Sequence, residues 1–157
     1  MERSLVAYFS ATGTTKRAAE ALARKTGADL FEIIPENPYS PKDLDWHDGS
    51  SRSSIEMNDL DCRPEIASRL DSLEPYETIY LGFPVWWYVE PRIIDTFLES
   101  YDFSRKTIIP FATSGGSGLG KAPQHMAKLC PDATVQAGGL LNNLSDSAIE
   151  QIIAASE

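Results

Sequence analysis

The stretch RSLVAYFSATGTT, residues 3–15, decides which fold the chain adopts. Its first part, residues 3–9, is a short apolar run of the kind that forms a strand buried on both faces. Its second part consists of Ser10, Ala11, Thr12, Gly13, Thr14 and Thr15. Alanine and leucine then recur at helical spacing from Ala18, and Gly27 is typical of a helix end. Residues 10–15 therefore join a buried strand to the N-terminus of a helix.

This first loop has the composition of an anion site. It carries four hydroxyl groups and one glycine, whereas an ordinary helix N-cap needs a single hydroxyl. The first N–H groups of a helix are unpaired and the helix dipole favours negative charge, so the hydroxyls and the backbone can hold a phosphate together. Gly13 lets the backbone approach the anion closely. The Walker ending and the G-x-G-x-x-G fingerprint are both missing from the loop, which favours a monophosphate.

Strand and helix patterns alternate along the whole chain. Further strands are expected at residues 29–34, 78–83, 107–113 and 133–136, and further helices at residues 64–73, 91–100, 121–129 and 147–155. The alternation predicts an α/β fold, a three-layer sandwich in which a five-stranded parallel sheet has helices on both faces. Pro110 is awkward in its strand, because proline cannot donate a ladder hydrogen bond.

The first loop resembles the phosphate loop of flavodoxins, Thr/Ser-x-Thr-Gly-x-Thr, in sequence and in its place after the first strand. The alternation of strands and helices also covers the chain as it does in flavodoxins. The resemblance implies one flavodoxin-like domain over residues 1–157, the strand order 2-1-3-4-5 and FMN as the cofactor. In such sheets, ligands bind beyond the carboxyl ends of the strands.

Two more loops at that edge agree with a flavin site. The loop after the third strand contains Pro84, Val85, Trp86, Trp87 and Tyr88. Its aromatic residues suit a stack on a flat ring, although a loop packed on its own helix has the same composition. The loop after the fourth strand contains Thr113, Ser114, Gly115, Gly116 and Gly118. Its exposed N–H groups suit the pyrimidine edge of a flavin, although a flexible turn has the same sequence.

Two features depart from the flavodoxin pattern. The loop after the fourth strand lacks the second aromatic residue, so one flavin face is open or is covered by Tyr39, Trp46 or Tyr88. Many flavodoxins also turn a peptide at a glycine in the loop after the third strand when the flavin is reduced. Residues 84–90 contain no glycine, so a change to positive φ costs more there.

The charge of the chain is concentrated in one segment. The whole chain has 14 basic and 23 acidic residues, a net charge of −9, and residues 36–77 hold 4 basic and 11 acidic residues, 4 − 11 = −7. This balance argues against nucleic acid and anionic membranes as partners. The segment is either a solvated loop or a docking surface for a basic-faced redox protein.

The favoured function is electron transfer by an FMN-binding flavodoxin-like protein that docks a redox partner. The alternative is an FMN-dependent NAD(P)H oxidoreductase that reduces a small-molecule, quinone-like acceptor, and a weaker option is a module that holds another nucleotide. In both flavin interpretations the cofactor does the redox chemistry, and no side chain is expected to act as a catalytic acid or base. Cys62 and Cys130 make no disulfide framework and no secretory signal begins the chain, so we expect a cytoplasmic protein.

Three other polar residues have open or structural roles. Arg63 either contacts the edge of the ligand or pairs with a nearby acid. His47 is expected to face solvent, with proton donation to a substrate as the alternative, and His125 is expected to be structural. No cluster of cysteine and histidine in the sequence suggests a metal site.

Overall fold

The computed structural model describes residues 3–10, 13–45, 47–59, 61–70, 72–85, 90–113, 119–136, 138–141 and 146–154. Its strands are β1 (Ser4–Tyr8), β2 (Asp29–Glu32), β3 (Thr78–Pro84), β4 (Thr107–Thr113), β5 (Thr134–Val135) and β6 (Gly139–Leu140). Its helices are α1 (Thr14–Thr26), α2 (Arg52–Asn58), α3 (Arg92–Ser100), α4 (Ala122–Leu129) and α5 (Asp146–Ala154). The strands pair in parallel in the order β2-β1-β3-β4-β5, and β6 pairs with β4 as well. The predicted fold class and strand order are confirmed.

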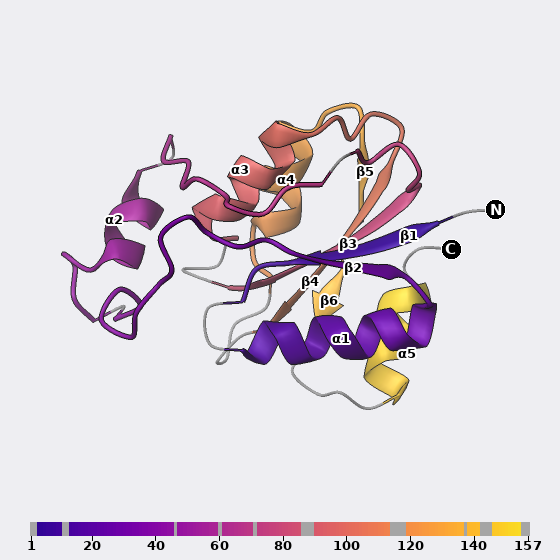
Figure 1. Cartoon of the computed structure of the whole chain (residues 1–157), viewed down its shortest axis with the longest axis horizontal. Helices are drawn as coiled ribbons and strands as arrows, with labels where there is room; N and C mark the ends of the chain where they lie inside the picture. Colours follow the sequence, from indigo (N-terminus) through magenta and orange to yellow (C-terminus); the bar gives the residue numbers. More distant parts are fainter. Residues whose placement is uncertain are drawn as a thin grey trace.

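Helices cover both faces of the sheet (Figure 1). Helices α1 and α5 lie on one face, where small side chains such as Ala18 and Ala19 let α1 pack closely on the strands. Helices α3 and α4 lie on the other face, where Ile94 and Phe97 belong to the larger apolar cluster. The described part of the chain contains no helix that is long and apolar enough to cross a membrane.

The helix predicted at residues 64–73 is wrong. Residues 65–68 run antiparallel to the chain that follows β2, with a bridge between Pro35 and Ile66. The N–H of Ala67 donates to the carbonyl of Ile34 at 2.6 Å, so this pairing uses backbone groups that a helix would need. The helix of this region is α2, which lies within the acidic segment, residues 36–77, that was interpreted as a solvated loop or a docking surface.

Pro110 lies within β4 as predicted, and it explains why the neighbouring strand is broken. The carbonyls of Ile108 and Ala112 accept hydrogen bonds from the N–H groups of Gln136 and Leu141 at 2.9 and 2.8 Å, and these two residues directly follow β5 and β6. Pro110 lies between Ile108 and Ala112 on β4 and faces the same side of the strand, but a proline has no N–H to donate. The strand expected at residues 133–136 is present as β5, and β6, which was not predicted, follows it as a second short piece.

Candidate functional site

The three loops that were expected to hold a ligand begin side by side. The N–H of Phe9 donates to the carbonyl of Gly82 at 2.9 Å, and the N–H of Val85 donates to the carbonyl of Thr113 at 2.9 Å. Pro84 is paired with Thr113 in the register of β3 and β4. The loops after β1, β3 and β4 therefore start at one edge of the sheet. Helix α1 begins at this edge and α2 lies beyond it (Figure 1).

Gly13 gives the start of α1 an open approach. It is the N-cap of α1, its φ is 93°, and no side chain caps the helix there. A Cβ built at Gly13 would have no atom within 4 Å, so the space beside it is empty of the described protein atoms. Its N–H donates to Ser10 Oγ at 3.0 Å, which leaves the hydroxyl proton of Ser10 for another acceptor. This arrangement leaves room for an anion at the helix start.

Thr15 connects the first loop to the fourth strand. Its Oγ1 lies 2.8 Å from Oγ1 of Thr113, and the two residues are 98 positions apart in the sequence. The exposed fractions are 2% for Thr15 and 5% for Thr113. Thr15 was predicted as one of the hydroxyls that hold the anion. In the structure this hydroxyl is engaged with Thr113, so it fixes two of the loops relative to each other.

We expect Thr15→Val to lower the free energy of unfolding by about 1–3 kcal/mol, because it leaves the buried hydroxyl of Thr113 without its partner. The double variant Thr15→Val/Thr113→Val removes both hydroxyls and should cost less than the sum of the two single changes. Urea unfolding of the four proteins of this double-mutant cycle measures the coupling. If the losses in the free energy of unfolding of the two single variants add up to that of the double variant, then the two hydroxyls do not interact.

Several predicted ligand residues lie outside the described residues. They are Ala11, Thr12, Trp86, Trp87, Tyr88, Ser114, Gly115, Gly116 and Gly118. Their contacts with a ligand remain predictions. Thr14 is described as an exposed residue in the first turn of α1, and Val85 follows directly after β3.

Tyr39, one of the aromatics considered for the second flavin face, is held beside α2. The guanidinium carbon of Arg52 lies 3.8 Å from the centre of its ring, and the ring of Phe9 meets it edge-on at 5.5 Å. The Tyr39 hydroxyl donates to Glu56 Oε1 at 2.5 Å. For Arg63, the structure favours the ion pair over the ligand contact, with Nε 2.7 Å from Oε1 of Glu99.

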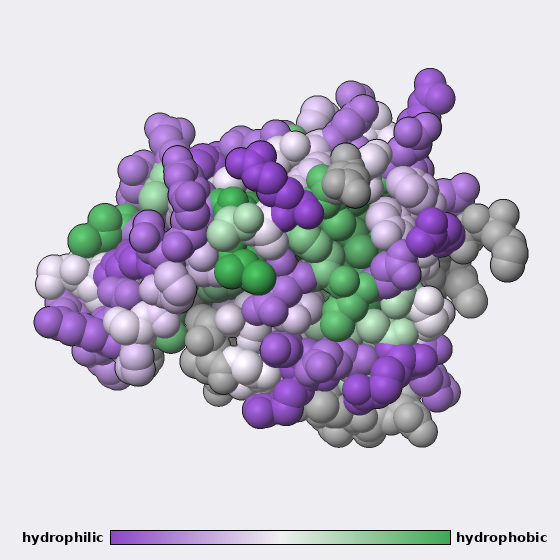
Figure 2. All heavy atoms as spheres, in the orientation of Figure 1, coloured by the Kyte–Doolittle hydropathy of each residue, from purple (hydrophilic) through white to green (hydrophobic). Residues whose placement is uncertain are grey.

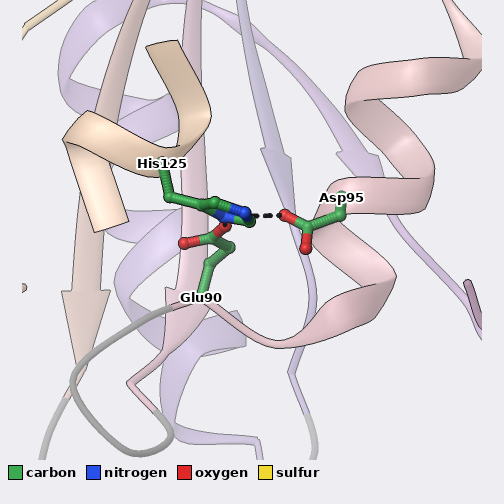
Figure 3. A group of neighbouring side chains, drawn as sticks. All are labelled: Glu90, Asp95 and His125. Carbon is green, nitrogen blue, oxygen red and sulfur yellow. Dashed lines mark hydrogen bonds and ion pairs between the residues drawn. The ribbon is translucent and has the colours of Figure 1, made fainter. Parts of the chain in front are cut away.

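A second polar cluster lies between α3 and α4. It consists of Glu90, Asp95 and His125, whose side chains converge (Figure 3). His125 Nδ1 contacts Oε1 of Glu90 and lies 3.7 Å from Oδ1 of Asp95. The two carboxyl side chains are 0% exposed and the His125 side chain is 27% exposed.

The two acids of this cluster are hard to ionise together. Burial raises the pKa of Glu90 above its ordinary value. Burial, and then the neighbouring Glu90 carboxyl, raise the pKa of Asp95 to about 8. The sequence suggested only that His125 is structural, because residues that are 35 positions apart carry no shared local pattern.

Comparisons with known proteins agree with this architecture. The chain is 50% identical to a provisionally assigned flavoprotein from Bacteroides uniformis, with a TM-score of 0.92 and 98% of each chain covered. A provisionally assigned flavoprotein from Bacteroides eggerthii is 46% identical, with a TM-score of 0.93 over 98% of this chain and 97% of that chain. A flavoprotein from Lactobacillus acidophilus, crystallised in complex with FMN, shares the fold at 24% identity and a TM-score of 0.70, over 98% of this chain and 99% of that chain. No curated protein matches the chain.

The family assignment rests on a match that spans almost every element of the sheet and its helices. The sequence model of the flavodoxin family matches residues 3–155. This range contains the phosphate-loop pattern and all the described strands. The chain belongs to the flavodoxin family.

Proposed function

We propose that the chain binds FMN at the carboxyl edge of β1, β3 and β4 and transfers electrons to a redox partner protein. The observation that supports this most directly is the start of α1. There Gly13 leaves open space at an uncapped helix N-terminus, and Ser10 supplies a hydroxyl beside it. A phosphate monoester dianion matches both the partial positive charge and the available donors.

The charges around the start of α1 are compatible with a phosphate group. The first turn of α1 contains no acidic residue, and it carries the exposed Lys16 and Arg17. The acids of the molecule are concentrated instead in residues 36–77. When bound, FMN supplies one- or two-electron redox chemistry, and the protein supplies its position and electrostatic surroundings. The FMN complex of the Lactobacillus acidophilus protein, which has the same fold, supports the choice of cofactor.

The ring of the flavin would lie beyond β3 and β4 in this proposal. Val85 and Thr113 mark where the two loops leave the sheet, joined by the hydrogen bond between their backbones. Residues 86–88 and 114–118 are proposed to hold the isoalloxazine, the first by aromatic contact and the second by backbone N–H groups. The pair of Thr15 and Thr113 fixes the distance between the phosphate end and the ring end of the site.

A comparison of FMN with riboflavin tests whether the phosphate is recognised. We expect the flavin-free chain to bind FMN at least about 100-fold more tightly than riboflavin, a difference of about 2.7 kcal/mol, measured by quenching of flavin fluorescence. Gly13→Ala should narrow this ratio at least about tenfold, because alanine adopts positive φ at a cost of about 1–2 kcal/mol and shifts the loop. Gly27→Ala, which changes another positive-φ glycine at the far end of α1, is the matched control. Equal affinities for the two flavins would contradict a phosphate site.

The part of the acidic segment around α2 is proposed as the surface that meets the partner. Hydrophilic side chains dominate the surface around α2, which lies beyond the edge where the loops begin (Figures 1 and 2). Exposed acids of this segment include Asp59 and Asp61. A basic-faced redox protein would approach this edge under electrostatic attraction, which raises association rates and makes them sensitive to salt.

We expect reduction of the FMN-loaded chain by a basic-faced flavoprotein reductase to slow at least about tenfold when ionic strength is raised, because salt screens the attraction. Asp59→Asn/Asp61→Asn should slow the reaction at low salt. The matched control is Glu74→Gln/Glu77→Gln, which neutralises two exposed acids next to the amino end of β3. Stopped-flow absorbance measures each rate. This docking surface would be excluded if the rates do not depend on ionic strength, or if they fall equally in the Asp59/Asp61 variant and in the control variant.

The alternative function is an NAD(P)H oxidoreductase, which the absence of glycine from residues 84–90 favours. An anaerobic reductive titration shows whether reduction occurs in one-electron or two-electron steps. Steady-state NAD(P)H oxidation with a quinone tests the enzyme directly, and a rate no faster than that of free FMN removes this candidate.

A further inference from the structure

The cluster of Glu90, Asp95 and His125 is built from the start of α3 and from α4 (Figure 3). Glu90 stands just before the N-cap of α3, Asp95 lies in the first turn of α3, and His125 projects from α4. One ligand atom from each residue lies within 4.8 Å of the other two. The sheet and its helices therefore place an imidazole nitrogen and two carboxylate oxygens around one point.

Among the residues that the structure describes, the carboxyl groups of this cluster have too few partners. Oδ1 of Asp95, which faces the imidazole, has no hydrogen-bond partner among the described residues, and neither has Oε2 of Glu90. Both side chains are fully buried. A buried polar atom that makes no hydrogen bond is costly, and so are two carboxylates side by side.

The neighbouring arginine compensates for these charges only partly. Arg92 Nη1 lies 3.5 Å from Oδ2 of Asp95, the other oxygen of that carboxyl group. Its Nε and Nη2 donate to backbone carbonyls at the end of α2. Oδ1 of Asp95 therefore lies 3.7 Å from Nδ1 of His125 without making a hydrogen bond, and a cation bound by both atoms would satisfy this oxygen.

We propose that Glu90, Asp95 and His125 bind one divalent transition-metal ion, for which Zn²⁺ is the best match. The ligand atoms are Nδ1 of the imidazole and one oxygen of each carboxylate. Zn²⁺ forms bonds of about 2.0–2.2 Å to such atoms, which in tetrahedral geometry lie about 3.4 Å apart. The observed separation of 3.7 Å between Nδ1 and Oδ1 of Asp95 is close to that value. Oε1 of Glu90, which contacts Nδ1 directly, would have to move away from the imidazole to admit the ion.

The ligand set also determines which ions are disfavoured. Mg²⁺ and Ca²⁺ prefer six or more oxygen ligands, so an imidazole with two carboxylates suits them poorly. Zn²⁺ binds such mixed nitrogen and oxygen sites more tightly than Mn²⁺ or Fe²⁺ does. His125, whose side chain is 27% exposed, gives the ion a route to the buried carboxylates. Three protein ligands leave a fourth position for water.

The experiment titrates Zn²⁺ into the chelator-treated full-length chain against a fluorescent zinc indicator. We expect one Zn²⁺ per chain and a rise in the melting temperature at saturation, because the ion binds only the folded site. Asp95→Asn and His125→Gln each remove a ligand with little change in volume. Each should weaken Zn²⁺ binding at least about tenfold, since even the loss of an outer-shell partner costs 10- to 100-fold.

His47→Gln is the matched control, because it removes an exposed histidine from a different segment. It should bind Zn²⁺ as the wild type does, and excess Mg²⁺ should not displace the ion. Glu90→Gln replaces either test variant if circular dichroism shows that the variant has not folded. The proposal is overturned if the wild type binds no Zn²⁺, if the ligand variants bind it unchanged, if His47→Gln weakens binding equally, or if Mg²⁺ displaces it.

Discussion

Replacing Gly138 by alanine is expected to lower the free energy of unfolding by about 3 kcal/mol or more. Gly138 joins β5 to β6 with a φ of 64°, a conformation that costs other L-residues about 1–2 kcal/mol. A Cβ at this position would lie 1.8 Å from the carbonyl oxygen of Pro110 and 2.8 Å from its carbonyl carbon. These are backbone atoms of β4, which is hydrogen-bonded on both sides, so they cannot move away without breaking the sheet.

Gly27→Ala separates the two causes of this loss. Gly27 also has a positive φ, 72°, but a Cβ there would meet no atom within 4 Å. Gly27→Ala should therefore lower the free energy of unfolding only by the conformational strain of about 1–2 kcal/mol. Urea unfolding of the three proteins, with the slopes compared, measures both differences. Equal losses at the two glycines would show that the contact with Pro110 is relieved without difficulty.

The sequence predicted the fold where local patterns and tertiary structure agree. Residues 3–9 and 107–113 are apolar enough to be recognised as buried strands, and both contain one. The sequence showed that Pro110 cannot donate a hydrogen bond within a sheet. The effect of this missing donor is seen in the neighbouring chain, which pairs with β4 as two short strands, β5 and β6. Within residues 133–140 the glycines at 138 and 139 signal a break, but its cause lies on β4.

The failed helix at residues 64–73 shows the opposite case. Its spacing suits a helix, but the half-buried Ile66 packs against the larger apolar cluster, and residues 65–67 pair with the chain that follows β2. Tertiary contacts of this kind override weak helix propensity. For α2, a signal was present in the serines, since Ser51 is the N-cap and its side chain accepts from the N–H of Ser54.

The part of the candidate site that depends on topology alone was predictable from the sequence. Parallel strands bring their carboxyl ends to one edge, so the meeting of the three loops follows from the strand order. The contact between Thr15 and Thr113 does not follow from the strand order, because two hydroxyls 98 positions apart share no local sequence pattern. The same holds for Glu90, Asp95 and His125, which become a cluster only when α3 packs beside α4.

Arg92→Met is expected to lower the free energy of unfolding by about 3–5 kcal/mol and to make α2 open more easily. Arg92 is 3% exposed, and its Nε donates to the carbonyls of Glu56 and Asp59 at 3.3 and 3.2 Å. Its Nη2 donates to the carbonyl of Met57 at 2.9 Å. The last carbonyls of a helix have no partner within the helix, so this guanidinium caps the carboxyl end of α2. Methionine fills a similar volume but leaves these carbonyls without their donor, and a buried acceptor that loses its hydrogen bond costs about 1–3 kcal/mol.

Arg63→Met is the matched control, because Arg63 pairs with Glu99 at the surface, where the side chains are 26% and 46% exposed. Such a pair contributes about 1 kcal/mol or less. Urea unfolding gives the two losses, and hydrogen exchange locates them. In Arg92→Met, the amides of residues 52–58 should exchange faster while those of β1, β3 and β4 change only with global stability. If Arg92→Met costs no more than Arg63→Met, then α2 is held by its apolar contacts and by Tyr39, and the segment that carries the proposed docking surface does not depend on the arginine.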